Sequence, residues 1–197
     1  KNRIENKTLD AAITVLVDKS GSMTGMKDYY AFASMHLLTE VCTTLGIPLE
    51  VIGFSDGQAG YGPVSPTMFI YKGFRDLRVS QEALKHSFAL SSAYMFGNPD
   101  GENILWAYDR LLKRKERKRL LIVMSDGSPA ASKGMAGIGP FTEQTIKEIE
   151  QARKVDIYGL GLCSDAVAYY YKAYSIINNP DEIPTQLLNL IEQRILR

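Results

Sequence analysis

Hydrophobic runs alternate with amphipathic stretches along most of the chain. Short apolar runs rich in Val, Ile and Leu are typical of strands buried on both faces. We predict strands at 11–17, 49–54, 67–72, 119–124, 156–161 and 174–177. Between these runs, apolar residues recur with the spacing of a helix that buries one side. We predict helices at 28–45, 80–89, 101–113, 141–154 and 181–195.

The order of these elements predicts the fold class. Strands that alternate with helices favour a Rossmann-like, doubly wound α/β fold: a mostly parallel sheet with helices on both faces. The Gly- and Pro-rich segments 55–66 and 127–140 are predicted to be loops. In open sheets of this kind, ligands bind beyond the carboxyl ends of the strands. The loops that follow the strands are therefore where we expect a functional site.

The first predicted strand ends in an acid and two hydroxyls, within V-L-V-D-K-S-G-S-M-T. Asp18, Ser20 and Ser22 occupy alternate positions around a turn that Gly21 allows to be tight, so their oxygens face one side. A helix N-cap explains one hydroxyl but not an acid and two hydroxyls together. Hard oxygen ligands without His or Cys favour Mg²⁺, Mn²⁺ or Ca²⁺ over zinc. We therefore predict a divalent-cation site at Asp18, Ser20 and Ser22.

Such a site needs further acids, because one carboxylate holds a divalent ion poorly. Asp126 follows the strand at 119–124 in M-S-D-G-S-P and is predicted to bind the ion directly or through water. Glu102, in D-G-E-N-I-L, stands at the start of a helix, where the helix dipole also favours an acid. Glu102 is therefore either a ligand or an ordinary first-turn acid. If Glu102 does bind, the site is negative overall and attracts a partner's acid less strongly.

The motif D-K-S-G-S resembles the D-x-S-x-S signature of von Willebrand factor A (vWA) domains. This resemblance implies a metal-ion-dependent adhesion site (MIDAS) at the top of a Rossmann-like sheet. In that family a Thr from a second loop and an Asp from a third complete the site. Asp126 matches the third element, whereas Glu102 stands where the Thr would be.

Longer stretches resemble the carboxyl-terminal domain of CobT, a subunit of the aerobic cobaltochelatase. They are D-G-E-N-I-L-W-A-Y-D-R-L-L, R-L-L-I-V-M-S-D-G-S-P and S-D-A-V-A-Y-Y-Y-K-A-Y. The resemblance implies an interaction module with two partners: an AAA+ ATPase of the CobS type and a large metal-inserting subunit of the CobN type. A generic vWA adhesion or scaffold domain unrelated to cobalamin is the alternative. A metal-dependent hydrolase is a third hypothesis, in which the ion activates water.

The sequence lacks the familiar catalytic motifs, so we do not expect this chain to be an enzyme by itself. The sequence contains no G-x-S-x-G elbow and no G-x-x-x-x-G-K-[ST] phosphate loop. Neither His36 nor His86 is placed to act as a base for the serines, and both are predicted to be structural, as is Trp106. We expect a non-catalytic subunit whose partner turns over ATP.

Composition narrows the class of protein. With 197 residues, 45% of them hydrophobic, the chain fits a single vWA-like domain over 1–197. The opening K-N-R-I-E-N-K lacks a Met, so we expect the C-terminal part of a longer protein. A net charge of +1 argues against nucleic acid or membranes as partners. Two cysteines, Cys42 and Cys163, suit the reducing cytoplasm.

Other polar features receive simpler interpretations. The basic run 113–119 is predicted to be a solvated turn at the pole opposite Asp18. Asp56 is expected to be a surface-loop acid. Asp165 and the tyrosines at 169–171 are a candidate partner contact, with one or two of the tyrosines in the core.

Overall fold

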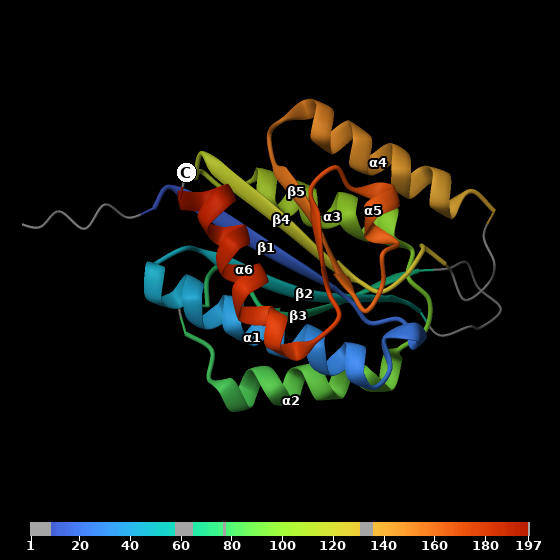
Figure 1. Ribbon diagram of the computed structural model, residues 1–197, viewed down its shortest axis with the longest axis horizontal. Coiled ribbons are helices and arrows are strands. Elements are labelled where there is room, and N and C mark those ends of the chain that lie inside the picture. Colours follow the sequence, from blue (N-terminus) through green and yellow to red (C-terminus); the bar gives the residue numbers. More distant parts are fainter. Residues whose placement is uncertain (1–8, 58–64, 77, 131–135, 197) are drawn as a thin grey trace, which may run out of the picture.

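The computed structural model describes residues 9–57, 65–76, 78–130 and 136–196, and in this part of the chain a six-stranded sheet forms the centre. The strands are β1 (Ala11–Asp18), β2 (Leu49–Asp56), β3 (Pro66–Lys72), β4 (Lys118–Ser125), β5 (Asp156–Leu162) and β6 (Tyr174–Ile177). Their order is β3-β2-β1-β4-β5-β6 (Figure 1). Every neighbouring pair is parallel except β2 and β3, which are antiparallel. The predicted doubly wound, mostly parallel α/β sheet is confirmed.

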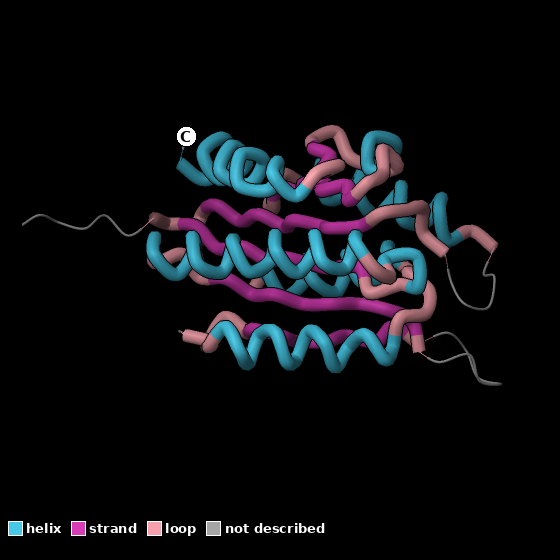
Figure 2. The backbone as a smooth tube through the Cα atoms, turned by 60° about the horizontal axis from the view of Figure 1, so that its bottom comes forward, coloured by secondary structure: helices cyan, strands magenta, loops and turns pink. Residues whose placement is uncertain are grey.

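Helices cover both faces of the sheet (Figures 1 and 2). The helices are α1 (Met26–Leu45), α2 (Gln81–Ser91), α3 (Asp100–Leu112), α4 (Ile138–Ala152), α5 (Val167–Tyr170) and α6 (Ile183–Ile191). Helices α1, α2 and α6 pack on one face, and α3, α4 and α5 on the other. The short α5 was not predicted, and α4 begins at Ile138, inside the segment expected to be a loop. Residues 131–135 of that loop lie outside the described residues.

Strand β1 shows why its sequence is apolar without alternation. All its residues are buried, and successive side chains enter different cores. Val15 and Val17 join the core beneath α1 and α6, whereas Leu16 joins the core beneath α3 and α4. Each such side chain contributes about 1.5–3 kcal/mol of burial free energy. The central strand is therefore held from both faces.

The register between β1 and β4 positions the loops that follow them. Val17 pairs with Met124 in the parallel ladder. The next residues, Asp18 and Ser125, therefore leave the sheet side by side at its carboxyl edge, on the right of Figure 1. Loops far apart in sequence meet there.

The expectation that Asp56 is a surface acid was wrong. Asp56 ends β2 and is buried, because the segment before α3 crosses over the strand end. Its Oδ1 accepts a hydrogen bond of 2.7 Å from the Gly97 N–H, and its own N–H donates to the Gly97 carbonyl at 3.0 Å. Asp56 thus holds the entry to α3 at the carboxyl edge.

The basic run lies where the sequence predicts. It precedes and begins β4, at the amino edge of the sheet, whereas Asp18 ends β1 at the carboxyl edge. Arg117 pairs with Asp10 at 2.6 Å, and Arg114 pairs with Glu116 at 2.6 Å.

Among the described helices, none is both long and apolar enough to cross a bilayer.

The Tyr171 ring packs so closely on β5 that only a glycine fits at position 159. A Cβ at this position would lie 2.5 Å from Cδ2 and 2.7 Å from Cγ of the buried Tyr171 ring. We expect Gly159→Ala to lower the free energy of unfolding by about 2 kcal/mol through overpacking. Gly139→Ala in α4 is the control, because its Cβ meets only an ordinary contact of 3.6 Å. Urea titrations measure both, and equal effects would contradict the packing explanation.

Candidate metal site

Asp18, Ser20, Ser22 and Asp126 form a cluster at the carboxyl edge of the sheet, called here the carboxyl-edge cluster. The carboxylate of Asp18 lies at its centre. Its side chain is fully buried. Oδ1 accepts a hydrogen bond from the Ser20 N–H at 2.7 Å, and Oδ2 accepts one from the Ser125 hydroxyl at 2.9 Å. The first bond folds the loop after β1 back on itself, and the second ties it to the end of β4.

A second set of hydrogen bonds joins the hydroxyls to the other loop. The hydroxyls of Ser20 and Ser22 lie 3.0 Å apart, and Ser22 Oγ donates to Asp126 Oδ1 at 2.8 Å. The structure therefore brings Asp18, Ser20, Ser22 and Asp126 into one cluster built from two loops. Ion binding by this cluster stays a prediction.

Asp100 is a residue of this site that the sequence reasoning missed. It is the first residue of α3 and is buried, and its Oδ1 has no hydrogen-bond partner among the described residues. Burial and the nearby charge of Asp18 raise the pKa of the Asp100 carboxyl well above its usual value. Helical spacing places Asp100 on the same face as the buried Ile104, Ala107 and Leu111, and this pattern was the signal available in the sequence.

Glu102 lies on the same first turn of α3. Its Oε2 is also buried without a hydrogen-bond partner in the described part of the chain, and its charge acts on Asp100. No hydrogen bond links Glu102 to the serines or to Asp126 in the described structure. Its role as a ligand therefore stays a prediction.

Burial makes the charged form of the Asp18 carboxyl unfavourable, and hydrogen bonds within the cluster offset this only in part. Burial raises the pKa of Asp18 to about 6, and the charge of Asp126 adds to this, whereas hydrogen bonds from Ser20 and Ser125 oppose it. Carboxylates kept under such a penalty are typical of functional sites. A bound cation would compensate the buried charge.

The donor set fits a hard divalent ion. Carboxylate and hydroxyl oxygens are the ligands that Mg²⁺, Mn²⁺ and Ca²⁺ prefer. One buried oxygen of each acid at the start of α3, Oδ1 of Asp100 and Oε2 of Glu102, lacks a hydrogen-bond partner in the described residues. No three His, Cys, Asp or Glu side chains within the described ranges form a ready group for an ion. The hydroxyls of Ser20 and Ser22 would therefore be needed as ligands.

Two lysines, neither predicted, neutralise acids around the cluster. Lys27, in the first turn of α1, forms an ion pair with Asp126. Lys19, inside the D-x-S-x-S motif, is fully buried. Its Nζ donates to Asp28 Oδ1 at 2.5 Å and to Ser92 Oγ at 3.2 Å. Lys19 thereby ties the loop after β1 to α1 and to the end of α2.

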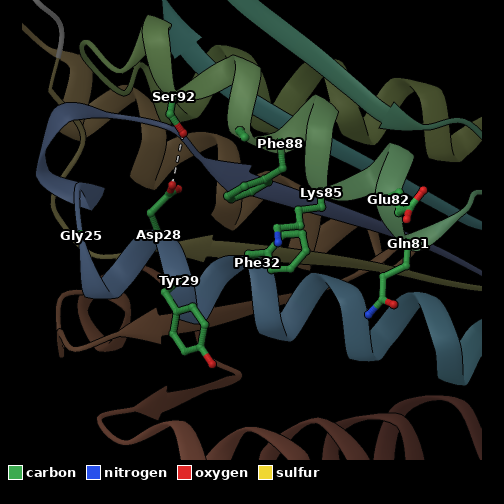
Figure 3. Close-up of a pocket in the computed structure, with 10 residues that line it drawn as sticks. Gly25, Asp28, Tyr29, Phe32, Gln81, Glu82, Lys85, Phe88 and Ser92 are labelled. Atoms are coloured by element: carbon green, nitrogen blue, oxygen red, sulfur yellow. Dashed lines mark hydrogen bonds between the residues drawn. The ribbon is translucent and has the colours of Figure 1, made fainter.

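A cavity of about 730 Å³ lies between α1 and α2 (Figure 3). Asp28 and Ser92 are joined at one end of it, and Phe32, Lys85 and Phe88 group along its wall. None of Asp18, Ser20, Ser22 or Asp126 lines this cavity. The cavity and the carboxyl-edge cluster are therefore separate features that meet at the Lys19–Asp28 pair.

Most of the remaining residues singled out in the sequence pack in the core or against neighbouring helices. Tyr171 is buried in the core, as expected for one of the three tyrosines, whereas Tyr169 is 72% exposed. His36 stacks on Phe32 and hydrogen-bonds Gln81. A partner contact at the tyrosines stays a prediction.

Solved structures with a similar fold include several pilus proteins. The vWF domain of the type V pili tip protein Mfa5 from Porphyromonas gingivalis matches 94% of this chain and 95% of its own, with a TM-score of 0.65 and 10% identity. The minor pilin PilB from Streptococcus sanguinis gives a TM-score of 0.68 at 10% identity, over 98% of this chain and 62% of its own. The pilus adhesin SpaC from Lactobacillus rhamnosus GG gives 0.66 at 15% identity, over 95% of this chain and only 30% of its own. At these identities the likeness shows the vWA fold alone.

The sequence itself matches one family over nearly its whole length. The family is described as "Cobalamin biosynthesis protein CobT VWA domain", and its model matches residues 1–90 and 86–196. The D-x-S-x-S loop and the S-D-G loop that the structure brings together both lie within the matched residues. The chain belongs to the family of CobT VWA domains, whose description links it to cobalamin biosynthesis.

Proposed function

We propose that this domain is a divalent-cation-dependent protein-interaction module of a cytoplasmic, CobT-like cobaltochelatase subunit. In this proposal it couples an AAA+ ATPase partner of the CobS type to a large chelating subunit of the CobN type. Asp18, Ser20, Ser22 and Asp126 hold the ion, with Asp100 and Glu102 available from the start of α3. The ion supplies a positive centre to which a partner's carboxylate binds.

One observation carries the proposal. Two loops that follow different strands are joined through Asp18, Ser20, Ser22 and Asp126 at the carboxyl edge, beside buried carboxylate oxygens without partners in the described residues. Turns and caps alone do not require this many oxygens around one buried acid. A cation shared by the two loops accounts for the set.

Exposed apolar side chains near the cluster support docking over hydrolysis. Met26 and Tyr29 flank Lys27 at the start of α1 and are 61% and 57% exposed. Phe141 of α4 is 43% exposed and lies against Gly101 at the start of α3. Aromatic and Met side chains are enriched in protein interfaces. A partner that covers this rim would place its own acid over the ion.

Ion binding is the first step to test. We expect isothermal titration of the domain with Mg²⁺ and Mn²⁺ to show one site, which Asp18→Ala abolishes. Asp100→Asn should weaken binding about tenfold if its oxygen reaches the ion or an ion-bound water. Asp165→Ala removes an exposed acid that follows β5 at the same edge and serves as the control. Equal titrations for the wild type and Asp18→Ala would contradict the metal site.

The stability of the chelator-treated domain should depend on pH through Asp18. Its folded pKa of about 6 lies above the ordinary value of 3.8, so ionisation opposes folding. This cost is absent below about pH 4, grows as the pH rises and is complete above about pH 6, where it reaches about 2 to 3 kcal/mol. We expect Asp18→Asn to be more stable than the wild type at pH 7.5 and equal to it at pH 3.5, by urea titration. A constant difference across this range would contradict the assignment.

The partner is tested with the full-length protein. We expect a pull-down in Mg²⁺ to retain an AAA+ ATPase, and Asp18→Ala or chelator to reduce its recovery at least tenfold. The charge variant Arg117→Gln at the opposite pole should leave recovery unchanged, because Arg117 lies at the amino edge of the sheet. Retention of the ATPase by Asp18→Ala at the wild-type level would separate partner binding from the ion.

A further inference from the structure

We propose that Lys27 is a tethered cation that competes with the divalent ion for Asp126, and so sets the ion affinity of the site. This inference rests on the proposed metal site. It adds that the chain carries its own occupant for that site, which must leave when the ion binds.

The contacts of Asp126 carry the inference. Its side chain is 1% exposed, so its charge depends on partners within the protein. Oδ1 accepts the hydrogen bond from Ser22, and Oδ2 is paired with the ammonium group of Lys27. The same ammonium lies 3.4 Å from the carbonyl oxygen of Ser22. Lys27 therefore sits against one predicted metal ligand and the backbone of another.

An ammonium group and a divalent ion cannot share this place. Both are compact cations that seek oxygen atoms, and two cations in near contact repel each other. An ion that binds Asp126 Oδ2 takes the oxygen that Lys27 now occupies. The Lys27-paired site and the ion-loaded site are therefore mutually exclusive arrangements.

Lys27 is free to leave without disturbing the fold. Its side chain is 32% exposed and sits on the first turn of α1, next to the solvent. The neighbouring acid Asp28 is already paired with Lys19 and bonded to Ser92. Once displaced, Lys27 moves on its flexible stem to the rim, where its charge faces an incoming partner. The buried Lys19 has no such freedom and keeps its structural place.

Removing the ammonium should tighten ion binding. The ion then no longer has to break the pair with Asp126, and we expect Lys27→Met and Lys27→Gln to bind Mg²⁺ and Mn²⁺ about five- to tenfold more tightly than the wild type, by isothermal titration. Lys147→Met is the matched control: Lys147 also pairs with a carboxylate, that of Glu143 on α4, and its loss should leave the affinity unchanged.

A second readout follows Lys27 in the wild-type protein. Reductive methylation, quantified by mass spectrometry, reports how accessible each lysine amine is. We expect saturating Mg²⁺ to raise the modification rate of Lys27 severalfold and to leave that of Lys147 unchanged. This measurement needs no variant, so it decides the question even where a variant folds poorly.

The outcomes separate this inference from the proposed function. Ion binding by the wild type, with equal or weaker binding by both Lys27 variants, overturns the competition and leaves the metal site standing. An unchanged methylation rate of Lys27 at saturating Mg²⁺ also overturns it. Absence of ion binding in the wild type and in both variants overturns the metal site and the competition together.

Discussion

The buried carboxylate of Asp18 is the constraint on which the carboxyl edge of this domain depends. Asp18 lies at the end of the central strand, fully removed from water. A buried charge of this kind is stable only where nearby groups bind it by hydrogen bonds or ion pairs. The Ser20 N–H and the Ser125 hydroxyl each donate a hydrogen bond to this carboxylate, which lowers the cost of its burial in part. These bonds also hold the loops after β1 and β4 against each other. Its raised pKa shows that the protein alone leaves part of this cost in place. This remaining cost is what the proposed divalent cation would offset.

Other buried polar residues hold this edge together from further away. Asp56 binds Gly97 through both its side chain and its backbone, and Gly21 N–H donates to the Phe96 carbonyl at 2.8 Å. These bonds fix the segment that leads into α3 and so place Asp100. The buried Lys19 links the same loop to α1 and α2. The carboxyl-edge cluster is thus supported from both faces of the sheet, and a change at any of these positions would reach the loop after β1.

Much of this arrangement was predictable from the sequence, for identifiable reasons. Each core strand is a continuous apolar run because both of its faces are covered, and this pattern is visible without coordinates. Asp18 and Asp126 are predictable as neighbours because each lies just beyond a predicted strand, and parallel strands end at the same edge. Asp56 met the same criterion and was misjudged, because the segment that buries it comes from 41 residues further along the chain. The sequence analysis names Glu102 and leaves out Asp100, although helical spacing places Asp100 on the buried face of α3.

The sequence by itself determined the fold class, the family and the acids and hydroxyls at the strand ends, because these follow from local periodicity and short motifs. Only the tertiary structure decided which charges meet. Lys27 and Asp126 are 99 residues apart, and Lys19 reaches Ser92 across 73 residues, so no local pattern announces either contact. Polar contacts of this kind depend on how loops and helices from distant parts of the chain pack at one edge, and that packing is a property of the whole fold.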